Sequence, residues 1–379
     1  LAELFQSLLG VAQVGVADSF FDLGGHSLIA VRLFAQIKRH YDLDLPLATL
    51  FEAPSVAALA DLLIQRGAVQ DPSSAAAAAA SGQNASPAYR HLVMLHPGPD
   101  LGPDLGPGGG AAPFFVVAGM FGNVLNLRHL AQEIGQERPV YGLQARGLLG
   151  SDAPHVTIPE AAQDYLAEIK QIQPQGPYLL GGFSGGGITA YEMAQQLQAK
   201  GDQIAALVLL DTPLPVRPAL KPIDKAWIKL QELRRKGPGY LLEWGKNRLL
   251  WEISKHRQAP TQTSAAPGFN NHKIEQAFRQ AVQSYQLRPW NGPLTLARPP
   301  LDRHWQVSQG QWVSSEREYV FTDNDWSGWA PGLTVVEVPG DHDSMVLVPN
   351  VSTLAAALKP RLTGGASAQP QPQTARAAE

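Results

Sequence analysis

Two serines in this sequence lie in glycine-rich turns ahead of helical patterns, and each could take part in covalent chemistry. Ser184 stands in Gly182-Phe183-Ser184-Gly185-Gly186, between an apolar strand pattern and a helix pattern. A sharp strand-to-helix turn projects such a hydroxyl, and small neighbours avoid a backbone clash. A phosphate-binding loop is the main alternative, but its lysine and the dinucleotide-binding spacing are missing. We therefore predict that Ser184 is a nucleophile.

A serine nucleophile needs a base and an acid that orients the base, in the chain order serine, acid, histidine. His342 follows a strand pattern in "VVEVPGDHDSM". Asp211 ends the strand pattern "IAALVLLD", and Asp323 ends "EYVFTD". We predict a triad of Ser184, His342 and Asp211, with Asp323 as the alternative acid.

The negative charge that develops during acyl transfer needs two hydrogen-bond donors. The first predicted donor is the backbone N–H of Gly185, directly after the nucleophile. The second should come from "VVAGMFGN", with Met120 as the first choice and Phe121 as the next. The alternative is that these residues only form a glycine-containing turn. We expect no metal site.

Composition excludes several classes of protein. The chain has 379 residues, 44% of them hydrophobic, a formal net charge of -3 and no cysteine. Nucleic-acid binding needs a concentrated excess of Lys and Arg, and a membrane span needs about 18 apolar residues in a row. We therefore expect a cytoplasmic protein with neither nucleic acid nor membrane as a partner. The start "LAELFQSLLG" already has helical spacing, so we expect further sequence upstream.

The patterns divide the chain into four parts. Residues 1–66 carry three helical patterns, and the Ala/Ser-rich stretch 67–88 is a predicted flexible linker. Strand and helix patterns alternate through 89–363, which predicts a mostly parallel sheet covered by helices on both faces. Helical and aromatic sequence at about 213–290 interrupts this alternation, and strand patterns resume at "EYVFTD" and "LTVVEV". We predict that the interruption is a lid, and that 364–379 is a disordered tail.

Ser27 lies in "FFDLGGHSLIAV" and could merely cap a helix. The sequence from Val14 to Leu63, with its D-x-F-F-D-L-G-G-H-S core and "LFEAPSVAALA", resembles the carrier domains of nonribosomal peptide synthetases. The resemblance implies a small all-α helical bundle with 4'-phosphopantetheine attached to Ser27. It also implies a phosphopantetheinyl transferase and upstream synthetase domains as partners. His26 favours the peptide-synthetase type of carrier over the polyketide type.

The region from about His91 to Leu362 is similar to the thioesterases that end such assembly lines, through "NLRHLAQEI", "RPVYGLQARGL", "GPYLLGGFSGGG" and "LVLLDTP". This similarity implies an α/β-hydrolase that takes the chain from Ser27 onto Ser184 and releases it by hydrolysis or cyclisation. The family commonly has His or Pro at Ala118 and a second glycine at Phe121. The alternative is an inactive hydrolase-fold module that docks or shields the carrier.

Charge suggests how the two domains meet. Ten basic and four acidic residues lie between Lys221 and Pro260, whereas residues 1–66 hold four basic and seven acidic ones. The same lid segment has Ile223, Trp227, Leu230 and Leu233 at helical spacing, a stripe that would face the core or a substrate channel. Our hypothesis is that the basic side of the lid steers the carrier; the alternative is a solvated helix face.

Overall fold

The computed structural model describes residues 1–25, 27–41, 43, 45, 49–66, 89–99, 110–148, 152–237 and 271–363. The predicted linker, the predicted tail, His26 and the centre of the predicted lid lie outside these ranges. Within them, no helix has the length and apolar character needed to cross a membrane.

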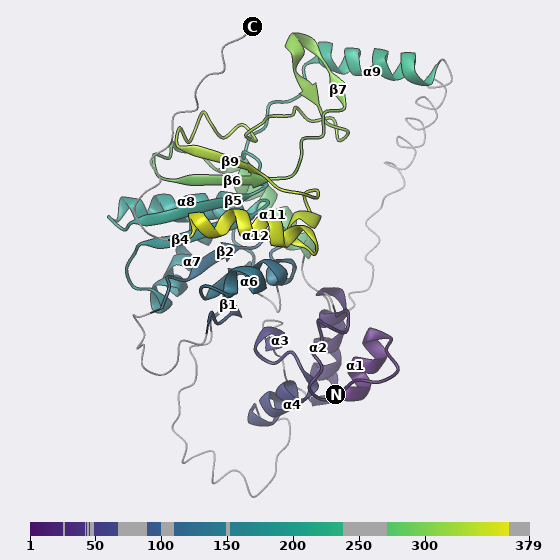
Figure 1. Cartoon of the computed structure of the whole chain (residues 1–379), viewed down its shortest axis with the longest axis vertical. Coiled ribbons are helices and arrows are strands. Elements are labelled where there is room, and N and C mark those ends of the chain that lie inside the picture. Colours follow the sequence, from purple (N-terminus) through teal and green to yellow (C-terminus); the bar gives the residue numbers. More distant parts are fainter. Residues whose placement is uncertain are drawn as a thin grey trace, which may run out of the picture.

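A seven-stranded sheet with the order β1-β3-β2-β4-β5-β6-β9 forms the centre of the larger domain (Figure 1). Its strands are β1 (Leu92–His96), β2 (Phe114–Val117), β3 (Val140–Leu143), β4 (Tyr178–Phe183), β5 (Ile204–Leu210), β6 (Leu294–Arg298) and β9 (Leu333–Glu337). Only β1 runs antiparallel to its neighbour. The loops after β2, β4, β5 and β9 therefore meet at one edge, where parallel sheets bind their ligands.

Helices cover both faces of this sheet, as an α/β-hydrolase requires. On one face lie α7 (Ile158–Ile172) and α8 (Gly186–Ala199), and on the other lie α6 (Arg128–Gly135) and α12 (Asn350–Leu358). The start of α7 shows how local sequence sets an element, because Thr157 Oγ1 accepts the N–H of Glu160 at 3.2 Å and Glu160 accepts that of Val156 at 3.0 Å. These reciprocal bonds satisfy N–H groups that the first turn leaves free. The predicted mostly parallel, helix-covered sheet is confirmed.

One of the two strands predicted late in the chain, "EYVFTD", is wrong. Residues 318–323 form no strand of the sheet; Tyr319 makes only an isolated bridge to Val313. The strand beside β5 is instead β6, which the sequence analysis did not predict. All five of its residues are buried although Thr295 and Arg298 are polar, and prolines enclose this short run on both sides. Asp323 consequently lies in a loop and not at a strand end.

The first 66 residues contain the helices α1 (Ala2–Leu9), α2 (Ser27–Tyr41), α3 (Thr49–Glu52) and α4 (Val56–Gln65). They enclose an apolar core of their own, whose largest fully buried side chains are Phe5, Phe20, Leu33, Ile37, Leu50 and Leu59. A domain of this size buries little surface, so its stability depends on placing most of its apolar side chains in one core.

This helical domain contacts the larger one at the segment that follows β2. Leu125, in the 3-10 helix η1 (Leu125–Leu127), belongs to the apolar cluster of the small domain. The guanidinium carbon of Arg128 lies 4.9 Å from the ring centroid of Phe21. Burial lowers the pKa of Arg128, and the charge of Asp22 opposes this shift. An apolar contact and a cation–π contact therefore join the two domains.

The helix α9 (Pro222–Lys236) departs from the predicted arrangement. The side chains Ile223, Trp227 and Leu230 are 58%, 44% and 38% exposed, so they face neither a core nor a channel. The helix instead buries Asp224, Glu232 and Ile228, and Ile228 packs in a cluster with Trp305, Val307 and Val313.

Hydrogen bonds explain this reversed burial. Asp224 accepts bonds from Ser308 and Tyr319, and Glu232 accepts one from Trp305 at 3.3 Å. Ser308 and Trp305 belong to a segment that contains the strand pair β7 (Trp305–Gln306) and β8 (Trp312–Val313). Paired carboxylates can be buried at low cost, whereas unpaired ones cannot.

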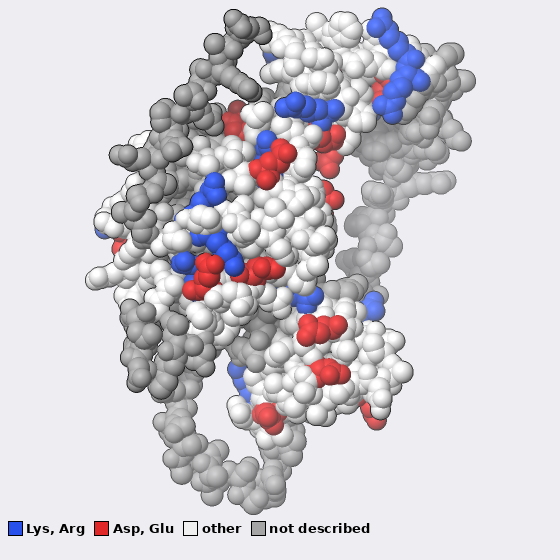
Figure 2. All heavy atoms as spheres, in the orientation of Figure 1, with Lys and Arg blue, Asp and Glu red and all other residues white. Residues whose placement is uncertain are grey.

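The basic residues of α9 lie at the opposite end of the molecule from the helical domain, as Figure 2 shows in the orientation of Figure 1. The steering hypothesis concerned the whole segment from Lys221 to Pro260, whose residues 238–260 lie outside the described ranges, so it stays a hypothesis. Arg128 is a basic residue that contacts the helical domain, through the ring of Phe21.

We predict that Arg128→Glu separates the two domains, because it removes a contact worth about 1 kcal/mol and sets a carboxylate beside Asp22. The radius of gyration from small-angle X-ray scattering should rise, and amides of residues 1–66 should tumble faster by NMR relaxation. Arg303→Glu, an equal charge change at an exposed residue, is the control. Identical scattering from both variants would contradict the prediction.

Candidate active site

Ser184 follows β4 directly, in a turn that glycine makes possible. Its backbone φ is 52°, in the left-handed region that non-glycine residues rarely adopt. A Cβ on Gly182 would lie 2.4 Å from the carbonyl carbon of Gly186, and one on Gly186 would lie 2.1 Å from the carbonyl oxygen of Ala118. Only glycine fits at these two positions, so the G-x-S-x-G spacing is a steric requirement of this turn.

A continuous chain of hydrogen bonds joins the three residues of the predicted triad. His342 Nε2 lies 3.0 Å from Ser184 Oγ, and His342 Nδ1 lies 2.7 Å from Asp211 Oδ2. The His342 ring also stacks on Phe183, with the ring centroids 5.2 Å apart. This geometry suits a histidine that takes a proton from the serine while the aspartate fixes its tautomer.

The acid of this chain has a second hydrogen-bond donor, which the sequence analysis missed. Asn324 Nδ2 donates to Asp211 Oδ1 at 3.0 Å and to the Thr212 carbonyl at 3.3 Å. Burial alone would raise the pKa of Asp211, but the hydrogen bonds from His342 and Asn324 outweigh it and lower that pKa. In turn, the bond to Asp211 raises the pKa of His342 against the effect of burial. Asn324 thus helps to keep Asp211 ionised.

The alternative acid, Asp323, has a different set of partners. Its two carboxylate oxygens accept the N–H groups of Asp325 and Ser327, each at 3.0 Å. These bonds hold the turn in which Asn324 adopts a φ of 49°. The structure therefore brings Asp211 to His342, and Asp323 holds the loop that carries Asn324.

Met120 and Gly185, the residues predicted to supply the oxyanion donors, lie close together. A Cβ built on Gly185 would lie 3.4 Å from the Cβ of Met120 and 2.6 Å from the ring of Phe278. Among the described residues, neither the Gly185 N–H nor the Met120 N–H donates to a backbone carbonyl. Their role as oxyanion donors stays a prediction. Phe121, the second choice, has its side chain 46% exposed.

The triad opens into a wide cleft with about 2640 Å³ of empty space, counted to its open mouth. Ser184, Asp211 and His342 all line it, together with segments that follow β5 and β6. The three side chains are therefore accessible to a ligand in the cleft.

Ser27 lies at the first residue of α2, after a turn that again depends on glycine. Gly24 has a φ of 90°, and a Cβ on Gly25 would lie 2.4 Å from the carbonyl oxygen of Phe20. The first N–H groups of a helix have no partner within it and favour a phosphate. The residues at this turn therefore fit a phosphate ester on the hydroxyl of Ser27.

Comparison with known proteins identifies both domains. The model of the thioesterase domain family matches residues 112–357, and that of the phosphopantetheine attachment site matches residues 1–63. The chain belongs to the thioesterase domain family. Its N-terminal region is a phosphopantetheine-attachment domain, and together they form a carrier–thioesterase didomain of the nonribosomal peptide synthetase type.

Several synthetases resemble this didomain. It is 32% identical over 346 residues to malpinin synthetase of Mortierella alpina, covering 91% of this chain and 4% of that protein. It is 29% identical over 381 residues to indigoidine synthase of Dickeya dadantii (strain 3937), covering 94% of this chain and 22% of the synthase. The didomain thus spans only a small part of these relatives.

A solved structure of a holo four-domain nonribosomal peptide synthetase, bound to AMP and glycine, is also similar. The TM-score is 0.51 at 25% identity, and the match covers 95% of this chain and 25% of that one.

We predict that Asp211→Asn lowers the pKa of His342, because the hydrogen bond with the carboxylate is the largest cause of its rise. NMR titration of 13C-labelled histidine gives the value directly and needs no substrate. Asp323→Asn, which removes a carboxylate from the loop, should leave the titration unchanged. Equal shifts in both variants would show that the pairing with Asp211 is not what raises the pKa.

Proposed function

We propose that this didomain releases a finished acyl or peptidyl chain from a biosynthetic assembly line. The observation that carries the proposal is the hydrogen-bond chain from Asp211 through His342 to Ser184, which opens into a large cleft in a protein with its own carrier domain. Phosphopantetheine attached to Ser27 would supply the thiol that holds the chain as a thioester.

In the first step Ser184 Oγ attacks the thioester carbonyl carbon and gives its proton to His342 Nε2. The carbonyl oxygen becomes negative and accepts hydrogen bonds from the Gly185 and Met120 N–H groups. The carbon–sulfur bond then breaks, and His342 returns the proton to the departing thiolate. The chain is now an ester on Ser184.

In the second step a nucleophile attacks this ester from the cleft, while His342 removes its proton. The carbon–oxygen bond to Ser184 breaks, and His342 gives the proton to Ser184 Oγ. Water as the nucleophile yields a free acid, whereas an amine or hydroxyl of the chain itself yields a ring. Throughout, the negative charge of Asp211 stabilises the protonated form of His342.

An inactive docking module, the alternative reading of the sequence, needs none of these alignments. Three side chains from three separate loops at hydrogen-bond distance therefore favour catalysis. Labelling with a fluorophosphonate discriminates between the two, because only an activated serine at Ser184 reacts.

We predict that Ser184→Ala abolishes release and leaves loading of Ser27 intact, since the change removes the covalent step and not the carrier. Intact-protein mass spectrometry should show acyl chains accumulating on residues 1–66. Ser27→Ala is the reciprocal control, because it should prevent loading yet preserve hydrolysis of a small soluble thioester. Release by Ser184→Ala at the parent rate would overturn the assignment of the nucleophile.

We predict that Asp211→Asn lowers kcat by about 10⁴, because the imidazole then adopts the wrong tautomer. Asn324→Ala should cost only about tenfold, since one hydrogen bond to a charged group is worth about 1.5 kcal/mol. Asp323→Asn should cost less than either variant, because it loosens only the turn. Steady-state hydrolysis of a soluble thioester gives the ranking, and a larger loss at Asp323 would reverse our choice of acid.

A further inference from the structure

A second pocket lies beside the oxyanion loop, separate from the cleft that holds the triad. It has about 470 Å³ of empty space counted to its open mouth, and its wall includes Gly119, Met120, Gly186, Thr189, Phe278 and Ala281. Met120 and Phe278 also line the cleft, so they form the boundary between the two spaces. We call this second space the inner pocket.

The charge of Arg146 in the wall of the inner pocket is compensated by two carboxylates. Arg146 lines it, but its guanidinium pairs with Glu160 at 2.5 Å and with Asp164 at 2.9 Å. His155 also lines it, and burial together with the charge of Arg146 lowers its pKa to about 4, so this ring is neutral at pH 7.

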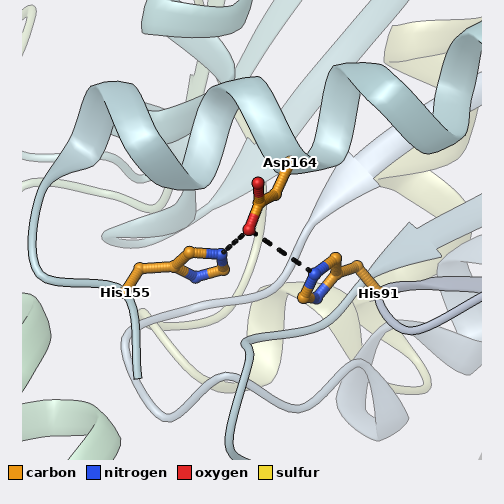
Figure 3. A group of neighbouring side chains, drawn as sticks. All are labelled: His91, His155 and Asp164. Atoms are coloured by element: carbon orange, nitrogen blue, oxygen red, sulfur yellow. Dashed lines mark hydrogen bonds and ion pairs between the residues drawn. The ribbon is translucent and has the colours of Figure 1, made fainter. Parts of the chain in front are cut away.

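Figure 3 shows Asp164 between His155 and His91, with its Oδ2 atom 3.1 Å and 3.9 Å from the two ring Nε2 atoms. This trio has donor types that bind metals. The oxygen that faces both rings already accepts a hydrogen bond from Arg146, however. A cation would have to displace that guanidinium, so the trio serves to hold the wall of the pocket in place.

The positions of the proposed catalytic groups indicate which part of the substrate lies near the inner pocket. His342 must protonate the departing thiolate, so the leaving group lies on the side of His342. That residue lines the cleft, and it is not part of the wall of the inner pocket. The carbonyl oxygen points at Gly185 and Met120. The remaining substituent of the carbonyl carbon, the acyl side, is left facing the boundary formed by Met120 and Phe278.

We propose that the inner pocket is a specificity site for one uncharged, apolar side chain, that of the residue whose carbonyl Ser184 attacks. The inference rests on the proposed function and names part of its substrate. Apolar wall residues on three elements supply the contacts: Ala161 on α7, Ile274 and Ala281 on α11 (Asn271–Ser284), and Val117 on β2. The rest of the chain lies in the cleft.

The test compares N-acetylcysteamine thioesters of N-acetylglycine, N-acetylphenylalanine and N-acetylaspartate. In the unmodified protein kcat/KM should be at least about tenfold higher for phenylalanine than for the other two. Ala281→Leu fills the inner pocket and should lower kcat/KM for phenylalanine by about tenfold, with glycine changed less than twofold. Ala161→Val, on the opposite wall, should act in the same direction.

Val282→Leu is the matched control, because this next residue of α11 lines the cleft and not the inner pocket. It should leave the ratio of phenylalanine to glycine unchanged. An unchanged ratio in both Ala281→Leu and Ala161→Val, with unaltered melting temperatures, would overturn the proposal. So would an equal preference for aspartate and phenylalanine.

A binding measurement separates this inference from the proposed function. In Ser184→Ala protein the 19F resonance of N-acetyl-4-fluorophenylalanine amide should broaden, and adding Ala281→Leu should abolish the broadening. If Ser184 resists fluorophosphonate and no thioester is hydrolysed, the proposed function fails, yet this measurement still decides whether the pocket binds the side chain. Equal broadening with and without Ala281→Leu would refute the pocket on its own.

Discussion

The close approach of two backbone segments is the constraint on which the rest of the site depends. The nucleophile turn lies so near the loop after β2 that a single added carbon on Gly186 would come within 2.1 Å of the Ala118 oxygen. This approach brings the loop that carries Met120 close to Gly185, the residue that follows Ser184. The same two segments form part of the wall of the inner pocket. The residues proposed as nucleophile, oxyanion donors and selectivity wall thus depend on one backbone contact.

The remaining catalytic groups reach this contact through the parallel sheet. Asp211 follows β5, and His342 follows β9, so residues 131 positions apart in the chain meet at the same edge. Neither group is held by its own loop alone. Asp211 is bonded to Asn324, whose turn depends on Asp323, and the His342 ring rests on Phe183 beside the nucleophile. Each of these loops thus supplies a side chain that holds a residue of another loop in place.

Much of this arrangement could be predicted from the sequence, because short apolar runs and glycine spacing are local signals. The turn at Ser184, the capped start of α7 and the strand before Asp211 are of this kind. The strand β6 was missed because it is only five residues long, lies between prolines and buries two polar residues, Thr295 and Arg298. Asn324 was missed because its partner is 113 residues away, although the run of side-chain carboxylates and amides around it signals a tight turn.

The helix α9 shows a different limit of sequence patterns. Apolar spacing predicted the wrong buried side, because the buried residues are Ile228 and the two carboxylates Asp224 and Glu232. An apolar contact of Ile228 and a few polar side chains thus attach this helix, whereas its outward residues bear little of the folding free energy. Substitutions at Ile223, Trp227 or Leu230 should be tolerated as surface changes. The outer surface of this helix can therefore diverge from one synthetase to another at little cost to folding, which is where adaptation to a new neighbour would begin.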